Sequence, residues 1–166
     1  GRQLAGTAKT VCNVMKILDY ITADTILTNR KEKKKKGVID ELTEPVAALT
    51  GLEQRNIVRV LIERERLGST GIGDGIAIPH GKINGIESLV LGFGLSRNGV
   101  NFDALDGKPA YIFFLLLSAD NSTGLHLRVL ARISKLLRDQ DFKEKLKRAN
   151  SAQQVMDVLS EVDEDF

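Results

Sequence analysis

The most apolar stretch of the chain is Tyr111-Ile112-Phe113-Phe114-Leu115-Leu116-Leu117. It has the length of a β-strand and is far too short to cross a membrane as a helix. Its apolar residues do not alternate with polar ones, so both faces of the strand are expected to be buried. Helices must then cover both sides of the sheet that contains it, which predicts an α/β fold.

The flanking sequence supplies further strands and turns. A second strand is predicted from Leu89 to Leu95, and the loosely alternating stretch from Ile17 to Leu27 predicts a short edge strand. Arg97-Asn98-Gly99 and the stretch from Ala104 to Pro109 have the composition of turns. The turn at 104–109 leads directly into the apolar strand.

A first long helix is predicted before the glycine-rich part of the chain. Apolar residues recur at helical spacing and stay in phase across Pro45, at Val38, Leu42, Val46 and Leu49. Proline removes one main-chain hydrogen bond, so we expect a single helix that is kinked at Pro45. We interpret the lysine-rich run at 31–36 as the solvated start of this helix rather than as a docking patch for an acidic partner.

A second helix is predicted after Thr50-Gly51-Leu52-Glu53, which has the form of a capping box. Its core-facing positions are Ile57, Val58, Leu61 and Ile62. Arg64 breaks this pattern, because it follows Ile57 by seven residues and so returns to within roughly 20° of the core-facing side. Its side chain either extends past the helix end or points into a site beside the next loop, and periodicity leaves both readings open.

Three helices are predicted to complete the chain. The first, from Leu125 to Arg138, has one apolar stripe, and His126 lies on it four residues before Leu130. Sequences that resemble capping boxes, Asp141-Phe142-Lys143-Glu144 and Ser151-Ala152-Gln153-Gln154, predict two shorter helices. On its position alone, His126 is interpreted as a core histidine.

Size and composition predict one globular domain. The 166 residues are 42% hydrophobic and 28% charged, and no apolar run has the length of a membrane helix. A net charge of +2, with basic and acidic residues interspersed, does not indicate nucleic-acid binding. The single cysteine, Cys12, excludes an internal disulfide and a cysteine metal cluster. We expect a cytoplasmic domain over residues 15–166 and a disordered leader at residues 1–14.

The candidate functional site is the loop Gly68-Ser69-Thr70-Gly71-Ile72-Gly73-Asp74-Gly75-Ile76-Ala77-Ile78-Pro79-His80-Gly81-Lys82. So many glycines indicate unusual backbone torsions or the close approach of a ligand. Pro79 favours an extended backbone at Ile78 and so aims the ring of His80. From these residues alone, a structural turn histidine and a chemically active one are equally compatible with the pattern.

An anion is the ligand that this loop suits best. A neutral imidazole has one free lone pair, which can take a proton, bind a metal or attack phosphorus. The hydroxyls of Ser69 and Thr70 and the N–H groups of a glycine turn can donate hydrogen bonds, and Arg64 adds a planar fork if it points inward. Donors and positive charge around a nucleophilic ring favour an incoming phosphoryl group.

Other kinds of site fit the sequence less well. Gly81-Lys82 precedes an isoleucine, so the loop is not a Walker motif, and it lacks the strand and glycine spacing of a dinucleotide fingerprint. A catalytic Ser-His-acid triad is not supported either, because the sequence lacks the nucleophile elbow that would present the serine. A zinc site would require His80, His126 and a carboxylate such as Asp74 to converge, and no ligand spacing supports it. We therefore expect no metal.

The segment from Gly68 to Lys82 closely resembles the active-site segment of the fructose/mannitol-type IIA proteins of the bacterial phosphoenolpyruvate-dependent sugar phosphotransferase system (PTS). It looks most like the nitrogen-regulatory branch, IIA-Ntr. Weaker similarity extends from about Ile17 to Leu159. The resemblance implies a single α/β domain with a mixed β-sheet sandwiched by helices.

The resemblance also implies a role for each site residue. His80 matches the histidine that accepts a phosphoryl group, on its outer nitrogen Nε2, from the phosphohistidine of an HPr-like carrier. Arg64 matches the arginine that stabilises the phosphate, and His126 matches a second, supporting histidine, which replaces its reading as a core residue. The loop residues expected around the phosphate are Ser69, Thr70, Gly71 and Gly73.

The predicted function is reversible phosphoryl transfer without a metal, nucleotide or other cofactor. A single domain without IIB or IIC parts fits a regulator that binds target proteins according to its phosphorylation state. One alternative is a sugar-uptake IIA component that passes the phosphate to a separate IIB protein. Another is a binding module of the same fold that is not phosphorylated, although the joint presence of Arg64, His80 and His126 argues against it.

Overall fold

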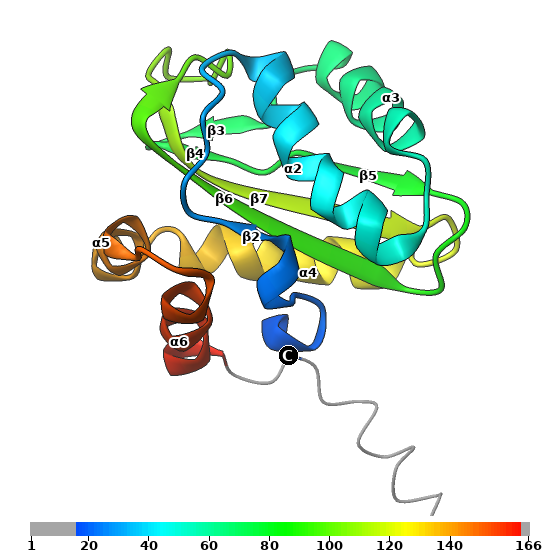
Figure 1. Ribbon diagram of the computed structural model, residues 1–166. Coiled ribbons are helices and arrows are strands. Elements are labelled where there is room, and N and C mark those ends of the chain that lie inside the picture. The colour runs from blue at the N-terminus through cyan, green and yellow to red at the C-terminus, as the bar shows by residue number, and fades with distance from the viewer. Residues whose placement is uncertain (1–15, 164–166) are drawn as a thin grey trace, which may run out of the picture.

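A mixed β-sheet runs through the middle of the molecule and carries helices on both faces (Figure 1). The structure is a computed structural model that describes residues 16–163. The leader predicted at residues 1–14 lies outside the described residues. The α/β class and the single mixed sheet between helical layers are confirmed.

The sheet has six strands, in the spatial order β2, β6, β7, β4 and β3, with β5 also paired to β7. Their bounds are β2 (Ile26–Leu27), β3 (Gly71–Gly73), β4 (Ile76–Ala77), β5 (His80–Ile83), β6 (Leu89–Val100) and β7 (Ala110–Ala119). The long pair β6 and β7 is antiparallel, whereas β4 and β5 run parallel to β7. The predicted edge strand is confined to β2, which follows two short 3₁₀ helices, η1 (Ile17–Asp19) and η2 (Ala23–Thr25).

Strand β7 is buried on both faces, as its unbroken apolar sequence predicted. Alternate side chains go to opposite sides, as the geometry of a strand requires. Phe114 and its neighbours on one side pack in a core cluster with Val129, Ile133 and Val155. Phe113 and its neighbours on the other side pack with residues such as Leu42 and Leu61. The domain therefore has one sheet between two apolar layers.

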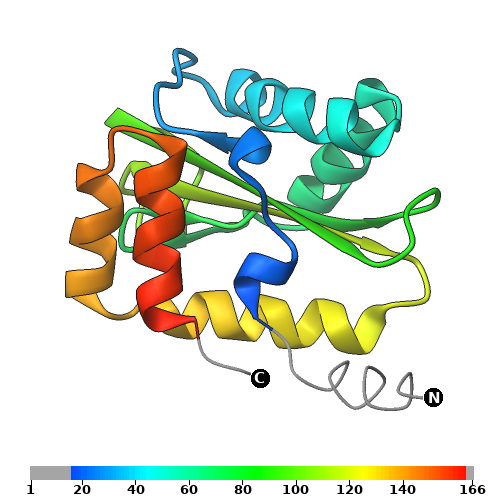
Figure 2. The same cartoon turned by 60° about the horizontal axis from the view of Figure 1, so that its bottom comes forward.

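The helices form two groups (Figures 1 and 2). Their bounds are α2 (Lys35–Thr50), α3 (Gln54–Arg66), α4 (Thr123–Leu136), α5 (Gln140–Arg148) and α6 (Ala152–Val162). Helices α2 and α3 cover one face of the sheet, and α4 covers the other together with α5 and α6. Helix α2 continues through Pro45 as one helix, as predicted. Within residues 16–163, no helix is both long and apolar enough to cross a membrane.

One predicted turn and one predicted core position were wrong. Arg97-Asn98-Gly99 is not a turn between strands but part of β6, which continues to Val100. The pairing with β7 is irregular between Leu95 and Val100, and Gly99 has a φ of +83°, so a bulge accommodates the turn-like residues. Leu49, predicted to face the core, is 47% exposed because it lies in the last turn of α2.

Two of the three predicted capping boxes do not cap a helix at the predicted residue. Thr50 is the last residue of α2 and its hydroxyl donates to the carbonyl of Val46 at 2.8 Å, so it does not cap α3. Helix α5 is capped by Asp139, whose Oδ1 accepts a hydrogen bond from the N–H of Asp141 at 2.9 Å. Only Ser151 acts as predicted, because its Oγ accepts from the N–H of Gln154 at 3.1 Å.

Replacing Phe113 with alanine is expected to lower the free energy of unfolding by about 3–5 kcal/mol. Phe113 is fully buried, with its ring centroid 5.5 Å from that of Phe102 and 5.0 Å from the guanidinium carbon of Arg30. Urea unfolding measures the change. Leu105→Ala is the control. Leu105 is 82% exposed, so its replacement should change the free energy of unfolding by less than about 0.5 kcal/mol. Equal losses in the two variants would contradict this account of the core.

Candidate functional site

The glycine-rich loop folds as a small hairpin that leads into β5. Strands β3 and β4 are antiparallel, and Asp74 and Gly75 form the turn between them with φ values of +58° and +81°. Positive φ at both positions is what a two-residue hairpin turn needs, and Asp-Gly is a favoured pair for it. After β4 the chain passes Pro79 and places His80 at the start of β5, beside Leu116 of β7.

The ring of His80 is fixed by a hydrogen bond to the backbone. Its Nδ1 lies 2.7 Å from the carbonyl oxygen of Ile78, and a carbonyl only accepts, so Nδ1 carries the proton and donates. The lone pair is then on Nε2. Burial is the largest cause that lowers the pKa of His80, and the positive charge of Arg64 lowers it further. The hydrogen bond to Ile78 and the negative charge of Glu65 act in the opposite direction and raise this pKa, but the net shift is downward. A neutral ring with a free Nε2 lone pair is a nucleophile at neutral pH.

His126 lies beside His80, in the first turn of α4. The two rings meet edge to face, with centroids 5.5 Å apart and planes at 61°. His126 is only 5% exposed, and its Nδ1 is 2.6 Å from the hydroxyl of Ser118 on β7. Burial, with smaller contributions from the nearby His80 and Lys82, lowers the pKa of His126 to about 4. His126 is therefore both a buried histidine and a neighbour of His80.

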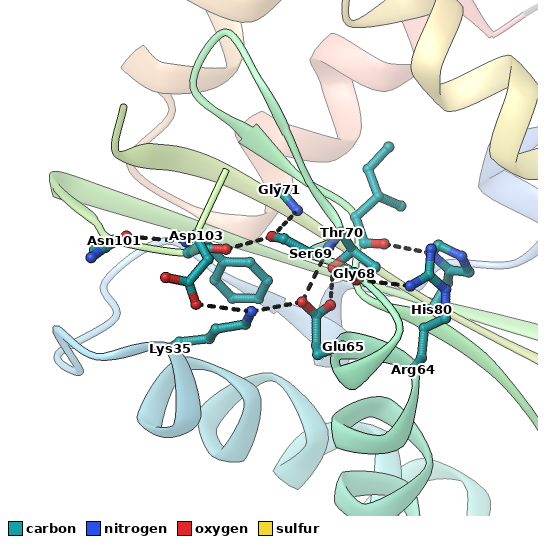
Figure 3. Close-up of polar contacts among 12 residues, drawn as sticks. Lys35, Arg64, Glu65, Gly68, Ser69, Thr70, Gly71, His80, Asn101 and Asp103 are labelled. Atoms are coloured by element: carbon teal, nitrogen blue, oxygen red, sulfur yellow. Dashed lines mark hydrogen bonds and ion pairs between the residues drawn. The ribbon is translucent and has the colours of Figure 1, made fainter. Parts of the chain in front are cut away.

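Arg64 turns back toward the loop from the last turn of α3. Its Nη1 donates to the carbonyl oxygen of Gly68 at 2.8 Å (Figure 3), and its positive charge is close enough to His80 to contribute to lowering the pKa of that ring. Of the two readings that the sequence left open, the structure therefore favours the one in which Arg64 faces the site. Arg64, His80 and His126 come together from α3, β5 and α4.

The hydroxyls of Ser69 and Thr70 are already occupied. Ser69 donates to the carbonyl of Phe102 at 2.6 Å and accepts from the N–H of Gly71 at 2.9 Å. Thr70 is buried, and its hydroxyl donates to the carboxylate of Glu65. In this conformation neither hydroxyl has a proton free for a phosphate oxygen. Their predicted contact with phosphate stays a prediction, whereas their role in holding the loop is visible.

Gly71 and Gly73 shape the hairpin of the loop, and their predicted contact with phosphate stays a prediction. The N–H of Gly71 is taken by Ser69, and its carbonyl accepts from the N–H of Leu105 at 3.2 Å. Gly73 has a φ of +94°, and a side chain there would meet the carboxylate of Asp106. Among residues 16–163, no group of three or more histidine, cysteine, aspartate or glutamate side chains could hold a metal ion.

Sequence reasoning missed two charged residues behind the loop, Glu65 and Lys35. The carboxylate of Glu65 accepts from the N–H of Thr70 at 3.1 Å and lies 2.8 Å from Nζ of Lys35 (Figure 3). Lys35 was included in the solvated lysine run, and Glu65 carried no motif of its own. The one available signal was the position of Glu65, directly after Arg64 and before the hydroxyl residues of the loop.

The stability of the protein is expected to fall as the pH drops from about 6.5 to about 4. The pKa of His126 is about 4 in the folded protein, against an ordinary value of 6.5, so the unfolded chain binds the proton more readily between these values. The loss from this one residue reaches about 3 kcal/mol at low pH. Urea unfolding at several pH values measures it, and His126→Gln should flatten the slope. An unchanged slope in this variant would contradict the assignment.

Comparison with known proteins identifies the family. Residues 19–162 match the family model described as phosphoenolpyruvate-dependent sugar phosphotransferase system, EIIA 2. The chain is 40% identical over 146 residues to a nitrogen regulatory protein of Bradyrhizobium diazoefficiens, and this alignment covers 88% of the chain and 95% of the relative. It is 35% identical over 150 residues to the PTS fructose-specific EIIABC component of Bacillus subtilis, and this alignment covers 90% of the chain and 24% of that protein.

A solved structure gives the same result for the fold. The crystal structure of nitrogen regulatory protein IIA-Ntr from Neisseria meningitidis has a TM-score of 0.80 and 33% sequence identity. The match covers 85% of this chain and 97% of that one. The chain therefore belongs to the type 2 EIIA family of the phosphoenolpyruvate-dependent sugar phosphotransferase system, and the nitrogen-regulatory IIA-Ntr proteins are among its most similar relatives.

Proposed function

We propose that this protein is a cytoplasmic phosphoryl carrier that accepts a phosphoryl group on Nε2 of His80 from an HPr-like protein. The observation that carries the proposal is the hydrogen bond from Nδ1 of His80 to Ile78, which leaves the Nε2 lone pair free. The positive charge of Arg64 acts on that ring and contributes to lowering its pKa. A nucleophile and a fixed cation are the two groups that phosphoryl transfer most needs from a protein.

The transfer is an exchange between two imidazoles. The lone pair on Nε2 of His80 attacks phosphorus, the bond from phosphorus to the donor's ring nitrogen breaks, and its electron pair returns to that nitrogen. His80 keeps its proton on Nδ1, donated to Ile78. Arg64 stabilises the negative charge on the phosphoryl oxygens, and no metal or nucleotide is required, because the bonds made and broken are of the same kind. The reaction is therefore reversible.

His126 supports this reaction by holding the acceptor ring in place. Its imidazole packs edge to face against His80 and is itself held by Ser118, so rotation of His80 is restricted. The ring is neutral at pH 7, since its pKa is about 4. Two charged histidines at this separation would repel each other, and two neutral ones do not. The three residues together favour a carrier over a binding module that is not phosphorylated.

Partner binding would respond to the charge that His80 gains. Leu67 and Leu127 are 85% and 58% exposed, next in sequence to Gly68 and His126 of the site. Contiguous exposed apolar surface marks sites that bind other proteins, and we propose that these two side chains contribute to such a site. A phosphoryl group on His80 adds negative charge, which changes the affinity for a target protein through local electrostatics. The similarity to nitrogen regulatory proteins favours such a regulatory role.

A second candidate is a sugar-uptake IIA component that passes its phosphate to a separate IIB protein. The observation that favours it is the 35% identity to a fructose-specific EIIABC component. The chemistry at His80 is the same in both cases. The two functions differ only in the next acceptor of the phosphoryl group.

The test is phosphorylation in a purified system. The protein is incubated with phosphoenolpyruvate, Enzyme I and an HPr-like carrier, and its intact mass is measured. One acid-labile phosphoryl group supports the proposal, and none with any cognate carrier would overturn it. IIB proteins from the same cell are then added to the phosphorylated protein. Rapid handover to a sugar-specific IIB would favour the sugar-uptake candidate over the regulator.

A further inference from the structure

A buried carboxylate lies directly behind the site loop. Glu65 is in the last turn of α3, and its side chain is only 5% exposed. It accepts hydrogen bonds from both the N–H and the hydroxyl of Thr70, the first at 3.1 Å. A charge removed from water costs several kcal/mol unless it is paired. The contacts of Glu65 therefore have to supply that compensation.

Lys35 supplies the compensating charge. Its Nζ is 2.8 Å from Glu65 and 3.3 Å from Asp103, and it lies 4.9 Å from the centre of the Phe102 ring. Lys35 belongs to the first turn of α2, where a lysine opposes the helix dipole and is unfavourable for helix stability. Its place in this network gives a reason for a lysine at that position.

The network continues to the ring of His80 (Figure 3). Glu65 holds Thr70, and the carbonyl oxygen of Thr70 accepts a hydrogen bond from the N–H of Ile78 at 3.0 Å. The carbonyl of Ile78 in turn accepts from Nδ1 of His80 at 2.7 Å. An unbroken path of polar contacts thus leads from Lys35 through Glu65, Thr70 and Ile78 to the imidazole.

We propose that Glu65, charge-balanced by Lys35, is a positioning residue that holds His80 in the tautomer with a free Nε2 lone pair. By fixing Thr70, whose carbonyl holds the N–H of Ile78, Glu65 restrains the backbone of Ile78. The carbonyl of that same residue accepts the hydrogen bond from Nδ1 of His80. A free neutral imidazole favours the proton on Nε2, which would leave no lone pair on that nitrogen. The protein has to impose the other tautomer, and the hydrogen bond at Nδ1 imposes it.

Lys35 has a second effect in this arrangement. An unbalanced carboxylate beside His80 would repel an incoming phosphoryl group, and the ammonium at 2.8 Å offsets that charge. The charge of Arg64 is then available to the phosphoryl oxygens. This consequence, and any effect of Glu65 on the transfer rate, rests on the proposed function of His80, whereas the tautomer does not.

The test compares Glu65→Gln with Glu63→Gln, which removes a carboxylate from an exposed position of the same helix. Imidazole ¹⁵N NMR on the unphosphorylated full chain reports the tautomer without any carrier. We expect the Nδ1–H form in the wild type and in Glu63→Gln, and a mixture of tautomers in Glu65→Gln. With phosphorylated carrier, Glu65→Gln should lower kcat about tenfold with little change in KM, because the carrier-binding surface is intact.

A second variant keeps the proposal testable if Glu65→Gln does not fold. Thr70→Val removes only the hydroxyl contact and keeps the N–H, and it should shift the tautomer and kcat in the same direction by a smaller amount. Wild-type tautomer and kcat in the folded variants would overturn the proposal. A tautomer shift in Glu65→Gln without phosphorylation of the wild type would support the positioning role and overturn the proposed function, so the two failures are distinguishable.

Discussion

Replacing His80 with alanine is expected to abolish phosphorylation by an HPr-like carrier. The variant removes the Nε2 lone pair, and the other imidazole of the site, that of His126, is buried and therefore poorly placed to replace it. The fold should be retained, since His80 is only half-buried at the start of a short strand. Intact mass spectrometry after incubation with phosphoenolpyruvate, Enzyme I and the carrier should show one acid-labile phosphoryl group in the wild type and none in the variant.

His126 provides the matched comparison, because the sequence has only two histidines. His126→Ala should still take up one phosphoryl group, more slowly, since the ring of His80 loses the neighbour that restricts it. The buried position of His126 makes it a poor acceptor. An acid-labile phosphoryl group that persists in His80→Ala and disappears in His126→Ala would reverse the assignment.

The main elements of the fold were predictable because their signals are local. The apolar run at 111–117 required a strand with two covered faces, and helical spacing identified the helices around Val38, Ile57 and Ile133. The turn at 97–99 was mispredicted for a physical reason. A bulge inside a long strand uses the same glycine and polar residues as a turn, and only the pairing with β7 distinguishes them.

The site was predictable in part, because a family resemblance carries residues but not their contacts. It named Arg64, His80 and His126, and these three lie together. It could not show that the hydroxyls of Ser69 and Thr70 would be taken by Phe102 and Glu65. Those partners are set by how α3 and the loop pack in three dimensions, which no spacing in the sequence records.

Replacing Arg64 with alanine is expected to lower kcat for phosphoryl transfer about 10²–10³-fold, the usual cost of removing one preorganised donor from a charged transition state. The positive charge of Arg64 acts on His80, and its guanidinium is held by the carbonyl of Gly68 at 2.8 Å. Quenched-flow transfer from purified phosphorylated carrier measures the rate. Arg66→Ala is the control, because Arg66 is exposed on the same helix. Equal rates in the two variants would remove Arg64 from the site.

Arg64→Lys separates charge from geometry at this position. A lysine keeps the positive charge but cannot form two parallel hydrogen bonds to phosphoryl oxygens, so its kcat should lie between those of the wild type and Arg64→Ala. The cation of Arg64 helps to lower the pKa of His80, so that pKa should rise in Arg64→Ala and change less in Arg64→Lys. An NMR titration of His80 measures it. A slower Arg64→Ala with an unchanged His80 pKa would mean that Arg64 acts through the loop rather than on the reacting ring.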